Sequence, residues 1–157
     1  MSRFEPWTLE RAAEIIAQHQ HEKGAALPIL NALQEVFGCV PLEAEPLIAG
    51  ALNISRAEVH GTVTFYHDYR REPPGRRTLK LCLAESCQAA GGRAIEKRCK
   101  EKLGVEMGET TLDRRVTLEP VYCLGLCHSS PAAMLGHDVY GMLDEEALDA
   151  LLKEAQS

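Results

Sequence analysis

The sequence has 157 residues, of which 45% are hydrophobic, and this supplies enough apolar surface for one compact domain or two small ones. The formal net charge of −6 would repel a phosphate backbone, so we do not expect nucleic acid as a partner. The chain has neither an apolar signal core at its N-terminus nor an uncharged apolar run of about 18 residues. We therefore expect a soluble, cytoplasmic protein with no membrane insertion.

The first 72 residues carry apolar side chains at helical spacing. Three runs predict helices on this basis, and they are Thr8–Gln20, Leu27–Phe37 and Leu42–Leu52. Ser55 and Glu58 then form the sequence pattern of a capping box, which predicts the start of a fourth helix. These elements predict a small helical bundle over residues 1–72.

Aromatic side chains gather near the end of this predicted bundle, beside a histidine. They are His60, Phe65, Tyr66 and Tyr69. Such a cluster is more often part of a core than a surface for a partner, so we expect these side chains to be packed.

A segment at residues 70–77 interrupts every periodic pattern. It reads Arg-Arg-Glu-Pro-Pro-Gly-Arg-Arg, and two prolines with a glycine cannot continue a helix or a central strand. We place the domain boundary here, with a second domain over residues 73–157. The four arginines are interpreted as a solvated hinge, and contact with an acidic partner surface is the alternative.

The second half of the chain alternates strands and helices. The predicted strands are Thr78–Leu83, Val116–Val121, Ala132–Leu135 and Asp138–Tyr140. A predicted helix over Ala89–Leu103 connects the first two, and the last two would form a hairpin. Asp144 is placed to cap a final helix that runs to about Glu154. The fold class is therefore mixed, with a helical bundle followed by an α/β domain.

Four of the six cysteines follow the two predicted parallel strands, where α/β folds gather their functional loops. Cys82 and Cys87 form a C-x4-C loop, and Cys123 and Cys127 form a C-x3-C loop. In a reducing compartment such clusters more often bind metal than form disulfides. Two pairs on neighbouring loops can give each iron of a [2Fe–2S] rhomb two thiolates. Structural zinc held by four cysteines fits the spacing equally well.

Other interpretations of the cysteines are weaker. Four buried thiols would seldom occur as two closely spaced loop pairs, and the C-x-x-C motif of thiol–disulfide enzymes is absent. Cys39 and Cys99 stand alone on predicted helices or their ends, so we expect packed free thiols there. His128 and Ser86 lie beside cysteines and are candidates for hydrogen bonds toward a cluster sulfur, although an exposed loop histidine is the simpler interpretation of His128.

Several motifs occur together along nearly the full chain. They are Glu-Val-His-Gly-Thr-Val-Thr-Phe-Tyr at 58–66, C-x4-C followed by Gly91-Gly92, and Cys-Leu-Gly-Leu-Cys at 123–127 with Pro131 after it. With these motifs the chain resembles the thioredoxin-like [2Fe–2S] subunits found beside the flavin subunit in complex I and NAD-linked dehydrogenases.

This resemblance implies a thioredoxin-like fold for residues 73–157 and one [2Fe–2S] cluster. It also implies that all four loop cysteines are ligands, with Cys82 and Cys87 on one iron and Cys123 and Cys127 on the other. The chain would then be a non-catalytic electron-transfer subunit with no catalytic residue of its own. A structural zinc module remains the alternative of a different class.

The second cysteine loop narrows the resemblance. Complex I members usually read C-x-G-A-C-x-x-A-P, whereas this chain has Leu126 in place of the first alanine and Ser-Ser-Pro-Ala-Ala at 129–133. This is similar to the gamma subunit of cytoplasmic, molybdenum-containing, NAD-dependent formate dehydrogenase. The similarity implies a partner with FMN, an NAD site and a [4Fe–4S] cluster, and a separate molybdenum-containing subunit that oxidises formate. An E-type subunit of complex I or of an NAD-linked hydrogenase is the alternative.

Overall fold

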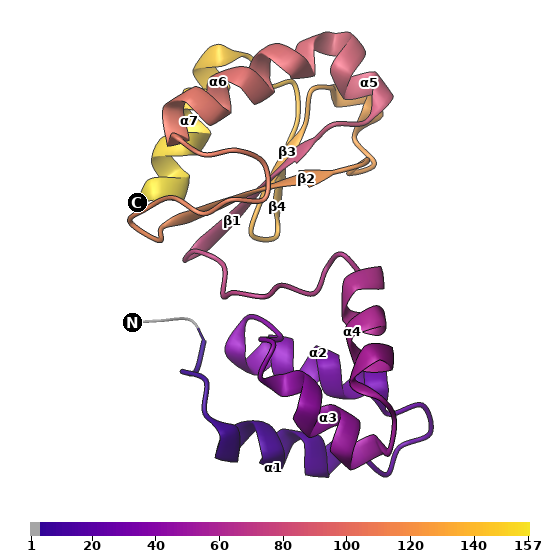
Figure 1. The fold of residues 1–157 in the computed structure, drawn as a ribbon. Coiled ribbons are helices and arrows are strands. Elements are labelled where there is room, and N and C mark those ends of the chain that lie inside the picture. The colour runs from indigo at the N-terminus through magenta and orange to yellow at the C-terminus, as the bar shows by residue number, and fades with distance from the viewer. Residues whose placement is uncertain (1–3) are drawn as a thin grey trace. The chain divides into compact units, whose positions relative to one another are not determined.

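The structure, a computed structural model, describes residues 4–157 (Figure 1). The chain forms two compact units that divide between Pro73 and Pro74. Neither residue can donate a backbone hydrogen bond, so no helix or sheet continues through this point. Within residues 4–157, no helix combines the length and apolar character that a bilayer crossing requires.

Four helices make up the described part of the first unit. They are α1 (Leu9–His19), α2 (Ala26–Phe37), α3 (Ala44–Leu52) and α4 (Arg56–Phe65). Their core is built from fully buried aliphatic side chains and Phe37, against which the ring of Trp7 packs edge-on with centroids 4.8 Å apart. The predicted capping box is confirmed, because Ser55 and Glu58 each accept a hydrogen bond from the other's backbone N–H at the start of α4.

The prediction that the aromatic cluster is packed is wrong for three of its members, the first of which is His60, whose side chain is 53% exposed. Phe65 is 71% exposed and Tyr66 is 43% exposed. The inward face of α4 carries Val59 and Val63, which are four residues apart, and Phe65 lies two residues beyond this stripe on another face of the helix. Tyr69 is partly buried, and its hydroxyl donates a hydrogen bond of 2.8 Å to the Asn31 side chain.

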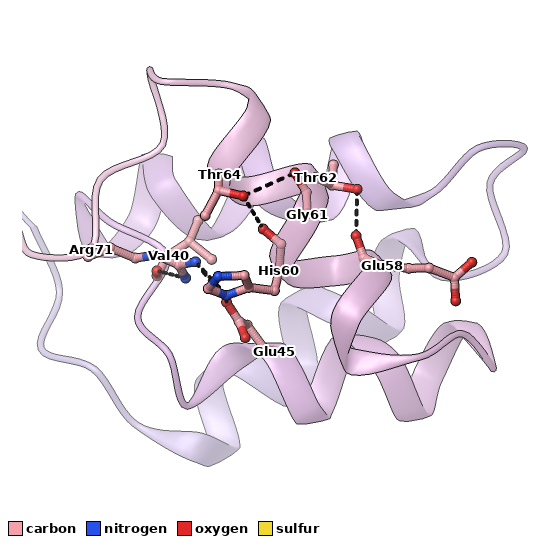
Figure 2. A network of polar contacts seen from close by, with 8 residues as sticks. All are labelled: Val40, Glu45, Glu58, His60, Gly61, Thr62, Thr64 and Arg71. Atoms are coloured by element: carbon pink, nitrogen blue, oxygen red, sulfur yellow. Dashed lines mark hydrogen bonds and ion pairs between the residues drawn. The ribbon is translucent and has the colours of Figure 1, made fainter.

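The segment after α4 is fixed to the helices rather than free. The Gln34 side chain donates to the carbonyl of Asp68 and accepts from the backbone N–H of Arg70, both at 2.7 Å. The guanidinium of Arg71 lies 2.8 Å from the carboxylate of Glu45 and donates to the Val40 carbonyl (Figure 2). The interpretation of this arginine as a solvated hinge residue is therefore wrong.

The second unit is a mixed sheet covered by two long helices. Its strands are β1 (Arg77–Cys82), β2 (Val116–Val121), β3 (Ala133–Leu135) and β4 (Asp138–Tyr140), in the order β2-β1-β3-β4. Strands β1 and β2 are parallel, while the other pairs are antiparallel. Helices α6 (Arg93–Leu103) and α7 (Glu145–Gln156) lie on the same side of the sheet and share its buried core (Figure 1).

The elements of this unit follow the sequence pattern with one exception. The predicted hairpin is present, and the side chain of Asp144 caps α7 by accepting a hydrogen bond of 2.8 Å from the backbone N–H of Ala147. The helix predicted over Ala89–Leu103 begins only at Arg93. Before it the chain makes a wider turn, η1 (Gln88–Gly92), because Gly91 adopts a left-handed backbone with φ of 96°.

Candidate metal centre

The two parallel strands end at the same edge of the sheet and deliver both cysteine loops there. Cys82 is the last residue of β1 and is paired in register with Val121, the last residue of β2. The backbone N–H of Leu83 donates a hydrogen bond of 2.8 Å to the carbonyl of Val121, so the chains are still adjacent as they leave the sheet. Cys123 follows two residues after that point.

The first loop buries its two cysteines. Cys82 and Cys87 are 5% and 2% exposed, and the short helix α5 (Glu85–Cys87) carries the second of them. Gly92 packs directly against the peptide of Cys87: a Cβ at position 92 would lie 2.6 Å from the Cys87 carbonyl oxygen. Only glycine fits there, so the turn after α5 holds Cys87 in place.

The second loop is a tight turn that brings its two sulfurs together. Cys123 and Gly125 both have left-handed backbones, with φ of 96° and 79°. The backbone N–H of Gly125 donates to the Cys123 sulfur at 3.3 Å, and the Cys123 and Cys127 sulfurs are 3.5 Å apart. Both side chains are exposed, in contrast to the first pair.

Backbone groups from both loops converge on the sulfur of Cys82. Burial by itself raises the pKa of this thiol, but hydrogen bonds from the backbone of Ala84, the side chain of Cys87 and the backbone of Cys123 and Leu124 lower it overall. Donors aimed at a sulfur stabilise its thiolate form, which is the form that binds metal. The first loop and the second loop therefore favour a thiolate at this position together.

The negative charges of the other three cysteines act on the pKa of Cys127. Its pKa is raised, first by the hydrogen bond and the negative charge of Cys123, then by burial and by the charges of Cys87 and Cys82. Like charges that disfavour one another in this way must be close in space. A cation placed among the four sulfurs would remove this repulsion.

The donor set fits an iron–sulfur cluster in kind and number. The structure brings the four predicted cysteines to one edge of the sheet, two from each loop. Apolar side chains surround the buried pair, and they are Ala84, Val121, Leu124, Leu126 and Ala132. Sulfur-only sites of this type hold iron–sulfur clusters or zinc. In the part of the chain that the structure describes, no three His, Cys, Asp or Glu side chains are grouped around a single metal-ion position.

Neither polar candidate beside a cysteine contacts a sulfur in residues 4–157, so the simpler interpretation of His128 as an exposed loop histidine is confirmed, and the candidate hydrogen bond from Ser86 to a sulfur is not present. His128 is exposed and, within residues 4–157, has no hydrogen bond to a cysteine sulfur. The hydroxyl of Ser86 contacts the Cys127 carbonyl at 3.0 Å and the hydroxyl of Ser130 at 2.9 Å, instead of a sulfur. Ser130 itself lies 3.6 Å from the Cys87 sulfur. Sequence reasoning missed this residue, although the Ser-Pro step departs from the Ala-Pro of the complex I pattern.

The two remaining cysteines lie in the cores of the two units, as expected. Cys39 and Cys99 are both buried. Burial is the main cause that raises the pKa of each thiol, to about 12 for Cys99. Thiols of this kind are unreactive packing residues, so the prediction of packed free thiols is confirmed.

Comparison with known proteins agrees with this geometry. The model of the thioredoxin-like [2Fe–2S] ferredoxin family matches residues 12–156. The chain is 35% identical over 152 residues to the E-type subunit of NADH-quinone oxidoreductase from Escherichia coli strain K12, covering 96% of this chain and 92% of the relative. It is 28% identical over 141 residues to the HndA subunit of the NADP-reducing hydrogenase from Solidesulfovibrio fructosivorans, covering 90% and 82%.

Solved structures give the same fold. The NAD⁺-reducing [NiFe]-hydrogenase in its H2-reduced state matches with a TM-score of 0.65 and 25% identity over 81% of this chain. The air-oxidised state matches with a TM-score of 0.63 and 23% identity over 85% of this chain. This chain spans 22% of the length of either hydrogenase chain. With helices, a mixed sheet and four cysteines at its edge, the chain belongs to the thioredoxin-like [2Fe–2S] ferredoxin family, whose members carry one [2Fe–2S] cluster.

Proposed function

We propose that this chain is a cytoplasmic electron-transfer subunit of an NAD-linked oxidoreductase, with its cluster bound by Cys82, Cys87, Cys123 and Cys127. The observation that carries the proposal is the meeting of two cysteine pairs at the common edge of β1 and β2. The cluster, when bound, accepts and releases one electron. No residue of this chain is assigned a bond-making role.

The sulfur positions support a division of the ligands by loop. Two thiolates on one tetrahedral metal, with bonds of about 2.3 Å, are roughly 3.8 Å apart. Cys123 and Cys127 are already at 3.5 Å, so little movement is needed for them to share one iron. Cys82 and Cys87 would then bind the other iron, and the buried side of the site would keep water from their sulfurs.

The ligand assignment is tested by metal analysis of the protein purified anaerobically. We expect about two irons and two sulfides per chain, and a spin-half EPR signal after reduction with dithionite. Cys82→Ala and Cys127→Ala should each lose the cluster. The matched variants Cys39→Ala and Cys99→Ala should retain it, because those thiols lie in the cores.

Two outcomes would overturn this proposal. One is stoichiometric zinc without iron in the anaerobic protein, which would indicate a structural zinc module. The other is an unchanged iron and sulfide content in both Cys82→Ala and Cys127→Ala.

We further propose that the parent enzyme is a molybdenum-containing, NAD-dependent formate dehydrogenase, in which this chain is the gamma subunit. Leu126 and the Ser-Pro-Ala-Ala run at 130–133 support this choice. The partner would be a subunit with FMN, an NAD site and a [4Fe–4S] cluster, which exchanges electrons with this chain. A molybdenum-containing subunit would oxidise formate.

A second candidate is an E-type subunit of NADH-quinone oxidoreductase or of an NAD-linked hydrogenase. It is favoured by the 35% identity to the Escherichia coli protein over nearly the full chain. The NADP-reducing hydrogenase subunit, at 28% identity, supports the hydrogenase version.

The two candidates are separated by isolating the native complex through a tag on this chain. Molybdenum and FMN in the complex, with NAD⁺ reduction driven by formate, are expected for the formate dehydrogenase. A complex that lacks molybdenum and reduces quinone with NADH would overturn the formate dehydrogenase assignment and support the complex I assignment. A complex that reduces NAD(P)⁺ with hydrogen would overturn the formate dehydrogenase assignment and support the hydrogenase assignment.

A further inference from the structure

Two serine hydroxyls connect the cysteine loops. Ser86 lies between Cys82 and Cys87 in the first loop, and Ser130 follows the second loop. Their oxygens are 2.9 Å apart. Both also lie within hydrogen-bond distance of the carbonyl oxygen of Cys127, at 3.0 Å for Ser86 and 2.9 Å for Ser130. Only Ser130 reaches a cysteine sulfur, that of Cys87, at 3.6 Å.

The direction of the contact between Ser130 and Cys87 depends on the state of the sulfur. A thiol at Cys87 donates its proton to the serine oxygen. A thiolate that binds iron has no proton, so the hydrogen in the same contact must come from the Ser130 hydroxyl. At 3.6 Å the separation falls within the range of hydrogen bonds that involve sulfur.

The hydroxyl protons can then be assigned one by one. The hydroxyls of Ser86 and Ser130 can each donate one hydrogen bond, and the two principal acceptors are the Cys127 carbonyl and the Cys87 thiolate. The Ser86 hydroxyl lies within hydrogen-bond distance of the carbonyl but not of the sulfur, so it donates its hydrogen bond to the carbonyl. The Cys127 carbonyl has two lone pairs and lies within reach of both hydroxyls, so the strength of the bond decides the partner of Ser130. A hydrogen bond to the charged Cys87 sulfur is stronger than one to a neutral oxygen that already accepts from Ser86.

We infer that Ser130 raises the reduction potential of the cluster by donating a hydrogen bond to the Cys87 sulfur, and that Ser86 is the positioning residue that directs this proton. The inference rests on the proposed function, because it requires Cys87 to be a ligand. Reduction adds negative charge to the cluster and its sulfurs, so a donor at a sulfur stabilises the reduced state more than the oxidised one.

Burial makes this single donor important. Cys87 is 2% exposed, so water cannot replace a missing hydroxyl at its sulfur without the loop opening. Cys123 and Cys127 are exposed, and water can reach their sulfurs in its place. The serine pair therefore acts on the half of the site where solvent does not.

The test is a potentiometric titration of the full chain with its cluster, followed by EPR. Ser130→Ala should lower the equilibrium constant for reduction by roughly tenfold, which is about 59 mV for a one-electron couple. Ser86→Ala should lower it by less, because the remaining hydroxyl then divides its proton between the sulfur and the Cys127 carbonyl. The double variant should have the potential of Ser130→Ala, since Ser86 acts only through its neighbour.

Two further variants separate tuning from a structural effect. Ser130→Thr retains a hydroxyl and should restore most of the potential. Ser129→Ala is the matched control in the same loop, because within residues 4–157 no hydrogen bond involves the side chain of Ser129, and its potential should equal that of the wild type. Exchange into D2O should shift the iron–sulfur stretching bands of the wild type and should shift those of Ser130→Ala less.

Each failure has a separate meaning. Two irons and two sulfides in Ser130→Ala with an unchanged potential would overturn the tuning role and leave the proposed function intact. Additive shifts from Ser86→Ala and Ser130→Ala would overturn the assignment of Ser86 as the positioning residue. A wild-type chain that takes up no cluster would overturn the proposed function and this inference with it.

Discussion

A single buried carboxylate joins three segments of the first unit. Glu45 on α3 is 3% exposed, and it binds His60 Nδ1 on α4 at 2.9 Å and the Arg71 guanidinium at 2.8 Å (Figure 2). Burial alone raises the pKa of this carboxyl, but the hydrogen bonds and charges of His60 and Arg71 lower it below its ordinary value. Because the carboxylate has lost water, its stability depends on these two partners.

We expect Arg71→Ala to destabilise the first unit by about 2 kcal/mol, since hydrogen bonds to charged groups are worth roughly 1.5–3 kcal/mol. The carboxylate of Glu45 would retain only His60. Urea denaturation followed by circular dichroism measures the difference. The control is Arg56→Ala on the exposed side of α4, which should change the free energy of unfolding by less than about 0.5 kcal/mol. Equal effects of the two substitutions would contradict the assignment.

The same carboxylate makes a defined contribution to stability against pH. Its folded pKa lies below the ordinary value of 4.5, so its contribution is fully present above about pH 4.5 and is lost as the pH falls through the folded pKa. The difference in unfolding free energy between wild type and Glu45→Gln should therefore shrink as the pH falls below 4.5. A difference that grows on acidification would have the wrong sign.

At the scale of elements, the turn between α5 and α6 decides whether Cys87 can be held in place. A Cβ at position 92 would meet the Cys87 carbonyl at 2.6 Å, and backbone cannot move aside as a flexible side chain can. We expect Gly92→Ala to reduce the iron and sulfide content per chain. Gly50→Ala, in α3, is the control: a Cβ there meets nothing within 4 Å, so the cluster content should remain unchanged. The stability of α3 should rise by up to about 1 kcal/mol.

Two phenylalanines of the first unit differ in burial, so we expect their replacement by alanine to have different effects on the free energy of unfolding. Phe37, at the end of α2, is fully buried, and Phe37→Ala should cost about 3–5 kcal/mol through lost burial and a cavity. Phe65, at the end of α4, is mostly exposed, and Phe65→Ala should cost less than about 0.5 kcal/mol. Thermal unfolding of the two variants compares them directly. A loss of several kcal/mol in Phe65→Ala would mean that its ring is packed after all.

Most elements are predictable from the sequence because their signals are local. The strand at Val116–Val121 begins and ends where its composition indicates, and the caps at Ser55 and Asp144 act within three residues. The start of α6 is not predictable in this way, because a left-handed backbone at Gly91 leaves no periodic signal. The exposure of Phe65 depends on which face of α4 it occupies, and the number of aromatic residues in the segment does not reveal this.

The cysteine site was predictable as a set but not in its details. Two short-spaced pairs after parallel strands indicate a common edge, because that is where such strands end. Ser130 and Cys87 are 43 positions apart in the sequence, and only the folded chain brings them into contact. Likewise, the bond between Glu45 and Arg71 joins residues that no local pattern connects.

At the scale of the whole molecule, each unit has its own hydrophobic core. The buried members of the first core are drawn from residues 12–63, and those of the second from residues 79–155. The proposed ligands all lie in the second unit, between residues 82 and 127. A group that binds only the folded form of one unit stabilises that unit by its binding free energy.

Removal of the cluster should therefore act on the second unit alone. After anaerobic treatment with a chelator and an oxidant, we expect faster amide exchange in residues 82–92 and 121–132, which form the loops around the sulfurs. Helices α1 to α4 should keep their protection, because their core contains no residue of the second unit among those that the structure describes. Cys127→Ala, which should already lack the cluster, is the control, and the same treatment should change nothing in it. Loss of protection throughout α1 to α4 would show instead that the two units unfold as one cooperative body, so that the cluster stabilises both.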